Sequence, residues 1–210
     1  MLTATLIGDV VASRTADDRS ALHERLTAVL AHVNDTFAPT TPLRITVGDE
    51  FQGGFDTLGH AVQASLRLRL ALMPELDVRH GLGWGEVRVL QEEPRVEDGS
   101  SWWAARDAIH EIQEAQGHPG SRFRRTAYRV ASDQAGPDAD LVNAALVLRD
   151  AAVGALSERS LSVLRGLLDG RTQRELAESL GISPSAVSQR VRSDGLAALV
   201  AADLGLGRVS

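Results

Sequence analysis

In the first two thirds of this chain, the order of the apolar segments limits the possible folds. Runs of strand length occupy residues 3–11, 43–47, 51–55 and 126–131, and residues 78–89 read as two more strands around a glycine-rich middle. Apolar residues at helical spacing follow Asp17 or Asp18, follow Asp56 or Thr57, and fill residues 102–116. We therefore expect an α+β fold, a ferredoxin-like sandwich with helices on one face of a mainly antiparallel sheet.

The rest of the chain reads as helical. Residues 138–153 predict a connecting helix, and everything after Leu156 predicts an all-helical tail. A length of 210 residues suits one large domain and one small one. We expect a head at 1–135, a connecting helix at 136–156 and a small all-α tail at 157–210.

Two aspartates follow strand-like runs in the head. Asp9 ends the first run, and Asp49 follows Gly48 between the second and third runs. A carboxylate at the end of a buried strand is costly unless a cation neutralises it. Two such carboxylates near glycine turns suit Mg²⁺ or Mn²⁺ that carries a nucleotide triphosphate. The alternatives are a helix cap or a pairing with Arg44 or Arg79 for Asp9, and a plain turn residue for Asp49.

The composition limits which metal, phosphate and DNA sites this chain can form. The absence of cysteine excludes disulfides and thiolate metal sites, and all 22 basic residues are arginine, so no lysine can hold a phosphate or select a base. A formal net charge of −6 means that any DNA affinity must come from a local face. The chain shows no basic leader and no long apolar stretch, which predicts a cytoplasmic protein without a membrane partner.

The spacing in residues 172–192 is typical of a helix-turn-helix. Ala177 is small where a second helix would cross, Gly181 suits a left-handed cap, and Ser183 with Pro184 suits the start of the next helix. The segment resembles the DNA-binding domains of response regulators and sigma factors. That resemblance implies a tail that docks its second helix in the major groove of double-stranded DNA.

Candidate DNA contacts follow from that docking. Gln and Arg side chains can read adenine and guanine edges, and Ser or Thr can touch phosphates; the candidates are Thr172, Ser183, Ser185, Ser188, Gln189 and Arg192. One such unit would bind poorly alone, so we expect a homodimer that reads two half-sites. The alternative is a helical hairpin that serves only dimerisation.

Four stretches of the head resemble class III nucleotidyl cyclases. They are residues 9–13, 47–49, 78–87 and 102–106, which look like the first metal loop, the second aspartate hairpin, the Arg-x-Gly strand pair and the Val-Asn-x-Ala-x-Arg helix. The same combination, followed by a helix-turn-helix, resembles the SatD family. The resemblance implies a cyclase-like sandwich that binds a nucleotide with Mg²⁺ or Mn²⁺ between two protomers. It implies metal ligation by Asp9 and Asp49, and nucleotide contacts from Val10, Gly48, Arg44, Trp102 and Arg106, with Arg106 reaching across from the partner chain.

Two departures from the cyclase pattern decide our functional prediction. Trp102 stands where the family has its ribose-orienting asparagine, and Ile45 stands near its base-selecting lysine. Losing one orienting group costs orders of magnitude in rate. We therefore expect a transcription regulator that binds DNA and senses a nucleotide without turnover. The alternatives are an active metal-dependent cyclase, and a constitutive DNA-binding dimer whose head is purely an oligomerisation scaffold. Arg106 could instead form an ion pair with Glu111 or Asp107, in place of a nucleotide contact. Glu50 ranks lower as a site residue, because it would face away from Asp49 on a strand.

Overall fold

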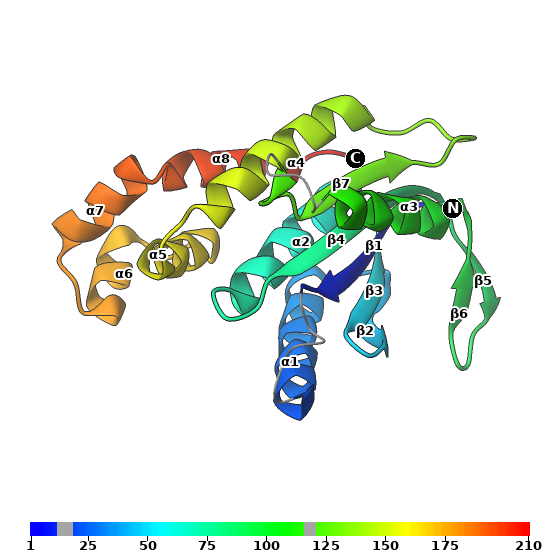
Figure 1. Cartoon of the computed structure of the whole chain (residues 1–210), viewed down its shortest axis with the longest axis horizontal. Helices are drawn as coiled ribbons and strands as arrows, with labels where there is room; N and C mark the ends of the chain where they lie inside the picture. The colour runs from blue at the N-terminus through cyan, green and yellow to red at the C-terminus, as the bar shows by residue number, and fades with distance from the viewer. Residues whose placement is uncertain (12–18, 116–120) are drawn as a thin grey trace.

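A five-stranded sheet forms the centre of the head. In the computed structural model, which describes residues 1–11, 19–115 and 121–210, the strands lie in the order β2-β3-β1-β4-β7 (Figure 1). They span β1 Leu2–Val10, β2 Thr41–Val47, β3 Glu50–Phe55, β4 Val78–Glu86 and β7 Thr126–Val130. Only the β4–β7 pair is parallel, so the prediction of a mainly antiparallel sheet in an α+β fold is confirmed.

Helices cover both faces of this sheet, which corrects the expectation of one covered face. Ala4 and Leu6 of β1 share a buried cluster with residues of α1 Arg19–Phe37 and α2 Leu58–Leu72. Ile7 points the other way, onto Trp102 of α3 Ser100–Ala115. Side chains alternate along a strand, so each apolar face of β1 needs its own helical cover.

The glycine-rich stretch of β4 explains how closely α3 packs. A Cβ at Gly81 would collide with the Ala105 carbonyl, and one at Gly83 with the Ser101 carbonyl. Residues 78–86 form one continuous strand paired along β1, so the predicted pair of strands around a turn there is wrong. The glycines admit the α3 backbone instead of turning the chain. The next strand, β5 Arg88–Gln91, pairs with β6 Val96–Asp98 in a separate two-stranded arm.

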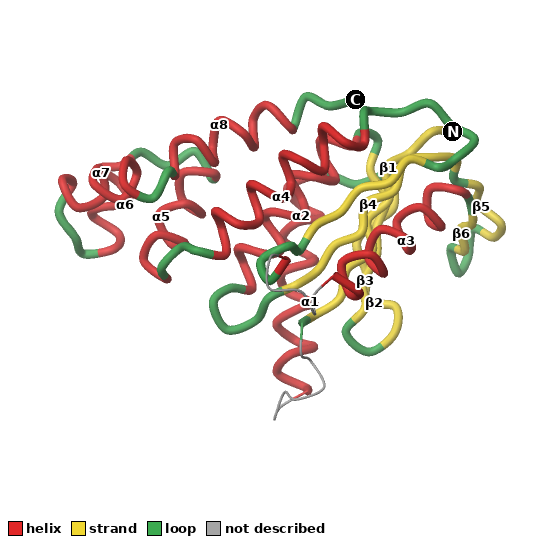
Figure 2. Tube along the Cα trace, turned by 45° about the horizontal axis from the view of Figure 1, so that its top comes forward, coloured by secondary structure: helices red, strands yellow, loops and turns green. Residues whose placement is uncertain are grey.

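The C-terminal helices extend from the sheet (Figure 2). They are α4 Ala139–Gly154, α5 Glu158–Leu168, α6 Gln173–Leu180, α7 Pro184–Ser193 and α8 Leu196–Leu206. Their core includes Leu66 and Leu70 of α2. Arg165 of α5 donates to the carbonyls of Leu70 at 2.7 Å and Met73 at 2.5 Å. The tail is thus packed and hydrogen-bonded onto α2.

Two helix ends of the tail lie where the sequence predicted them, at Gly181 and Ser183. Gly181 ends α6 with a left-handed φ of 63°. Thr172, predicted only as a DNA contact, caps α6 in a reciprocal pair with Glu175. The Ser183 side chain caps α7, with Pro184 in its first turn. At the turn from α6 to α7, the Gly181 N–H donates to carbonyls at the end of α6, and the Ser183 hydroxyl accepts from the Ala186 N–H at 3.1 Å.

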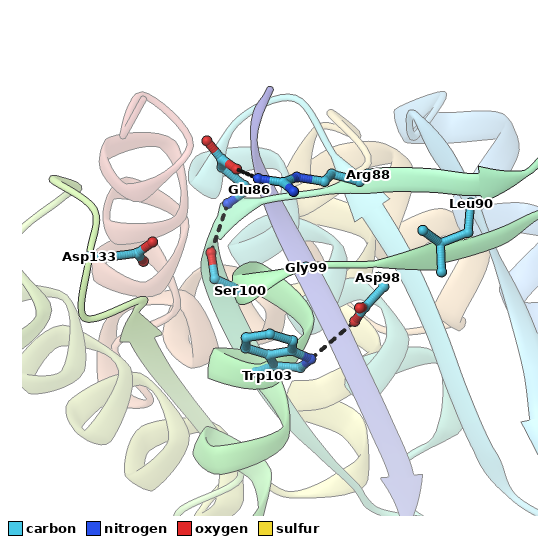
Figure 3. Close-up of a pocket in the computed structure, with 8 residues that line it drawn as sticks. All are labelled: Glu86, Arg88, Leu90, Asp98, Gly99, Ser100, Trp103 and Asp133. Atoms are coloured by element: carbon cyan, nitrogen blue, oxygen red, sulfur yellow. Dashed lines mark hydrogen bonds and ion pairs between the residues drawn. The ribbon is translucent and has the colours of Figure 1, made fainter.

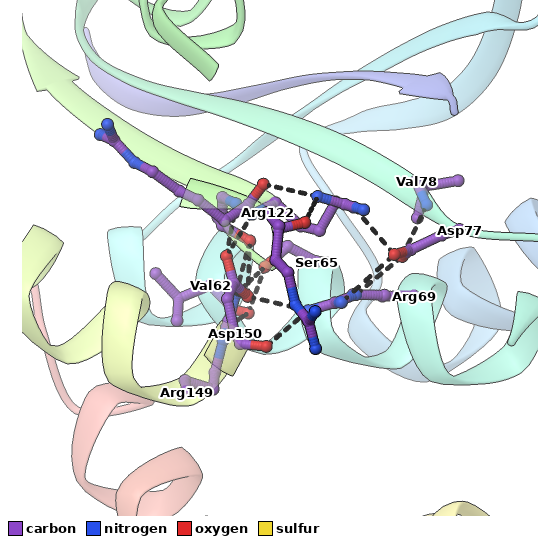
Figure 4. A network of polar contacts seen from close by, with 11 residues as sticks. Val62, Ser65, Arg69, Asp77, Val78, Arg122, Arg149 and Asp150 are labelled. Atoms are coloured by element: carbon purple, nitrogen blue, oxygen red, sulfur yellow. Dashed lines mark hydrogen bonds and ion pairs between the residues drawn. The ribbon is translucent and has the colours of Figure 1, made fainter. Parts of the chain in front are cut away.

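A buried ionic network joins α2, β4, β7 and α4 (Figure 4). Arg69 pairs with Asp77 at 2.8 Å and with Asp150 at 3.3 Å. The Asp150 carboxylate also accepts from the backbone N–H groups of Arg125 at 2.7 Å and Thr126 at 2.6 Å. The connecting helix α4 is therefore tied to the sheet by charge-assisted bonds as well as by apolar packing.

Some predictions fall on residues outside the described ranges. They are the helix caps Asp17 and Asp18, the later part of the first metal-loop resemblance at 12–13, and the end of the third predicted helix at Gln116. Within residues 1–11, 19–115 and 121–210, no helix combines the length and the apolar character that crossing a membrane requires.

Candidate functional site

Asp9 is held by an arginine of the neighbouring strand. Asp9 on β1 lies directly opposite Arg79 on β4. Arg79 Nε is 2.6 Å from Asp9 Oδ1, and its Nη2 is 2.8 Å from Oδ2. Gln113 near the end of α3 adds a third donor to Oδ2 at 2.9 Å. Of the partners that the sequence left open, the structure selects Arg79 in a bidentate pair.

Asp49 lies against the same strand end. Gly48 has a φ of 62°, which turns the chain between β2 and β3. The Asp49 side chain accepts a hydrogen bond from the backbone N–H of Val10 at 3.2 Å. The structure therefore brings the Asp49 carboxylate next to the residue that follows Asp9, although 39 positions separate Val10 from Asp49.

Arg106 pairs with an acid of its own chain. Its guanidinium contacts both Glu50 oxygens, at 2.5 and 2.8 Å. This pairing differs from the reach across to a partner chain implied by the resemblance, and also from a pair with Glu111 or Asp107. Hydrogen bonding to Arg106 lowers the pKa of Glu50, against the opposing effects of burial and of the nearby Asp49 charge. The same bond raises the pKa of Arg106, and the negative charge of Asp9 adds to that rise.

These residues form one charged cluster. Three acids, Asp9, Asp49 and Glu50, gather at the ends of β1 and β3 with Arg79 and Arg106 between them. Arg19 at the start of α1 is a further cation nearby, since a Cβ built on Gly48 would lie 3.9 Å from its Nη2. Glu50, which the sequence ranked lower, joins the cluster through its pair with Arg106. The sequence did not indicate Gln113 or Arg19, because each arrives through the packing of a distant element.

A divalent metal does not fit the cluster as it stands. Both Asp9 oxygens are already taken by Arg79, and one of them also by Gln113. No group of three or more His, Cys, Asp or Glu side chains able to hold an ion occurs in the described part of the chain. Arginine occupies the position that a cation would need.

Two of the predicted nucleotide contacts lie elsewhere. Trp102 is 8% exposed and packs on Ile7 and Ile109, so it is a core residue and not an open stacking surface. Arg44 is exposed on β2 and donates to the Arg95 carbonyl at 3.1 Å, away from Asp9. It lines a hollow of about 370 Å³ with residues of α1.

A separate cavity lies at the other end of α3 (Figure 3). It has a volume of about 260 Å³ and is lined by residues that include Glu86, Asp98, Asp133 and Trp103. Trp103 is 62% exposed, and its indole N–H donates to Asp98 at 3.1 Å. This cavity shares no residue with the Asp9 cluster, and no sequence motif indicated it.

The predicted DNA contacts gather around α7. Val187 and Val191 are buried beneath this helix, whereas Ser185, Gln189 and Arg192 are exposed. Ser188 is half-buried, and the Ser183 hydroxyl lies 2.9 Å from that of Ser185. Thr172 is engaged in the α6 cap with Glu175. One face of α7 therefore presents Ser, Gln and Arg side chains to solvent.

Solved structures with partial likeness are nucleotidyl cyclases. A bacterial light-regulated adenylyl cyclase has a TM-score of 0.47 at 12% identity, over 61% of this chain and 43% of that chain. A dimeric guanylyl cyclase domain from the aquatic fungus Blastocladiella emersonii has a TM-score of 0.42 at 15% identity, over 52% of this chain and 73% of that one. The adenylyl cyclase CyaB from P. aeruginosa has a TM-score of 0.39 at 14% identity, over 50% and 69%.

The family assignment comes from the sequence as a whole. No curated protein matches the chain. The model of the SatD family matches residues 3–202, which is nearly the entire length and includes both the charged cluster and the helices around α7. The chain belongs to the SatD family.

Proposed function

We propose that this chain is a DNA-binding transcription regulator whose head binds a nucleotide without turning it over. The head at 1–135 would sense the ligand, the segment 136–156 would connect, and the tail at 157–210 would contact double-stranded DNA. We place the protein in the cytoplasm as a homodimer. The observation that carries the sensing part is the cluster at Asp9, where guanidinium groups and carboxylates lie within bonding distance of one another.

Arginines at the cluster suit a phosphate-bearing ligand. A guanidinium presents a planar fork of donors that matches two phosphate oxygens. The Arg106 side chain is 39% exposed, and among the described residues Glu50 is the acid that pairs with it. A nucleotide phosphate can therefore replace that carboxylate. Asp9 and Asp49 remain candidate ligands for Mg²⁺ or Mn²⁺ brought by the nucleotide, and such binding would require Arg79 to leave Asp9.

The same cluster argues against turnover. Trp102, at the position of the asparagine in the cyclase pattern, is buried and has no open face for a ribose. A site of this kind can bind phosphate through charge, but it lacks the oriented groups that raise a rate.

The DNA part of the proposal is supported by the surface of α7. Gln189 and Arg192 are exposed one turn apart, and both side-chain types can contact base edges in a major groove. Ser183 and Ser185 at the start of the helix are placed to contact phosphates, as the N-terminus of a helix favours anions.

A selection from random duplex DNA tests the binding part. The full chain should enrich a sequence with two related half-sites, and the Gln189→Ala/Arg192→Ala variant should not. The matched control is Gln173→Ala/Arg174→Ala on α6, which removes the same side-chain types from the neighbouring helix. Equal enrichment by all three proteins, or none by the unmodified chain, would remove DNA recognition from the proposal.

Catalysis is the second candidate, because the Asp49 carboxylate does lie beside the strand end that carries Asp9. Incubation with each nucleoside triphosphate and Mn²⁺, read by mass spectrometry, separates the two candidates. Our proposal predicts unchanged triphosphate. A cyclic product that disappears in Asp49→Ala would establish the cyclase in its place.

A further inference from the structure

Two neighbouring helices expose a surface that is almost free of charge. On α4 and at its C-cap, Ala155, the exposed residues are Asp140, Leu141, Ala144, Val147, Leu148, Ala151 and Ala155. On α8, which contacts α4, they are Ala197, Ala198, Ala201, Ala202, Leu204 and Gly205. Asp140 is the single charged residue among these thirteen. Leu141 is 71% exposed, Leu148 73% and Leu204 57%.

The same molecule shows what an ordinary solvent-facing helix looks like. The exposed face of α1 carries His23, Glu24, Thr27, His32 and Asp35 among its residues. A helix that is apolar on its outer face as well as on its inner face is normally buried. The only charged residue of α8, Asp203, points inward and pairs with Arg67 at 3.1 Å. The outer faces of α4 and α8 therefore resemble a surface that another protein covers.

The spacing on α4 identifies the kind of partner. Leu141, Ala144, Leu148, Ala151 and Ala155 follow one another by three, four, three and four residues. This is the spacing of apolar residues that pack into the side-chain holes of a second helix. We call these five residues the α4 seam.

The α4 seam is complementary to itself. A twofold axis through Leu148 places Leu141 of one chain opposite Ala155 of the other, because both lie seven residues from Leu148. Large side chains then meet small ones at both ends, and two Leu148 side chains meet at the centre. The two helices run antiparallel, so their dipoles oppose, and the contact closes as a dimer of identical patches.

We propose that the α4 seam, flanked by α8, is the surface through which two copies of this chain form a twofold dimer. Each chain would contribute thirteen exposed residues, seven from α4 with its cap Ala155 and six from α8. A standard interface has roughly 20–30 residues per side. The dimer is therefore a concentration-dependent one. It does not require a nucleotide in the head, and it fixes the distance between the two α7 helices, because α4 leads into the tail.

Sedimentation of the full chain tests the surface. We expect a monomer–dimer equilibrium whose dissociation constant rises at least tenfold in Leu148→Glu, which places two like charges at the axis. The matched control is Leu90→Glu, an equally apolar and 66% exposed position on β5, which should leave the equilibrium unchanged. A wild-type chain that stays monomeric at every concentration, a Leu148→Glu dimer of wild-type affinity, or a dimer lost in Leu90→Glu instead would each overturn the proposal.

Disulfide trapping tests the geometry without relying on the glutamate variant. The chain has no cysteine of its own, so each introduced thiol reports one position. Leu148→Cys should form a covalent dimer under mild oxidation. Leu141→Cys and Ala155→Cys should cross-link when mixed, and neither should cross-link alone. Cross-linking of Leu141→Cys with itself, or no product from Leu148→Cys in a protein that is dimeric by sedimentation, would contradict the antiparallel pairing.

Discussion

Asp150 concentrates several stabilising contacts in one buried carboxylate. It pairs with Arg69, accepts two backbone N–H groups of residues 125 and 126, and is fully buried. Asp150→Asn should lower the free energy of unfolding by about 3–5 kcal/mol, because it removes the acid that pairs with buried Arg149 at 3.5 Å and one of the two acids that pair with Arg69. Urea unfolding of the full chain measures this. Asp140→Asn, at an exposed position of the same helix, should change it by no more than about 0.5 kcal/mol. Similar values for both variants would mean that the network contributes little.

His80 gives the protein a distinct pH dependence. It is fully buried against Phe51, and burial, with help from the charge of Arg149, lowers its pKa from 6.5 to about 3. Between these values the unfolded chain binds a proton that the folded chain does not, so stability falls as pH falls. From pH 7 to pH 5 this amounts to about 2 kcal/mol.

The matching variant isolates that contribution. His80→Gln cannot titrate, so its free energy of unfolding should depend less on pH between 7 and 5 than that of the wild type, by about the same 2 kcal/mol. Most carboxylates stay ionised in this window, which keeps them out of the comparison. Parallel curves for the two proteins would show that His80 does not carry the dependence.

Substituting the two members of the Glu50–Arg106 pair should change nucleotide affinity in opposite directions. Glu50→Gln should tighten nucleotide binding by up to about fivefold, because a half-exposed ion pair is worth no more than about 1 kcal/mol and its loss frees the arginine. Arg106→Gln should weaken binding. Titration calorimetry with nucleoside triphosphates checks both variants, and weaker binding in Glu50→Gln would indicate that this acid holds the ligand directly.

The close packing of α3 on β4 predicts that an added methyl group between them will destabilise the fold. Gly83→Ala places a Cβ against the α3 backbone at the Ser101 carbonyl, so it should destabilise the fold by about 1–3 kcal/mol. Gly205→Ala, in helix α8 with nothing within 4 Å of the new atom, should instead stabilise by up to about 1 kcal/mol. Chemical denaturation measures the free energy of unfolding of both variants. If Gly83→Ala leaves that free energy unchanged, α3 can shift outward.

Sequence-based prediction of the elements succeeded where the signal was local. The Thr57, Ser183 and Gly181 ends depend on a few neighbouring residues, and the structure has them where predicted. It failed where the cause was a distant element. The β4 glycines were interpreted as a break between two strands. The α3 backbone, which leaves no room for a Cβ at these glycines, lies outside residues 78–89. The Glu50–Arg106 pair was hidden for the same reason, since 56 positions separate the two residues.

At the scale of the whole molecule, the head and the tail are mechanically connected. Arg165 of α5 holds the carbonyls at the end of α2, and Asp203 of α8 pairs with Arg67 of α2. Leu66 and Leu70 of α2 lie in the same core as the α7 side chains Val187 and Val191. A ligand that shifts α2 must therefore shift the tail, which is the route our proposal needs for coupling nucleotide to DNA.

Arg165→Met tests that route, since it keeps an unbranched apolar stem and removes the hydrogen bonds of the guanidinium group to α2. We expect DNA affinity and nucleotide affinity to persist while the effect of nucleotide on DNA affinity shrinks. Fluorescence anisotropy with the selected duplex, with and without nucleotide, provides the readout. An unchanged nucleotide effect would place the coupling elsewhere, for instance through α4.

If the cluster at Asp9 senses a nucleotide for the tail, nucleotide must change the affinity of the tail for DNA. The affinity of the full chain for its selected duplex is measured by anisotropy with each common nucleotide and Mg²⁺, for the wild type and for Arg106→Gln. We predict that one nucleotide changes the affinity of the wild type by at least about fivefold, an ordinary allosteric coupling, and leaves Arg106→Gln unaffected. An affinity that stays the same with every nucleotide, in a protein that binds the duplex, would contradict the account.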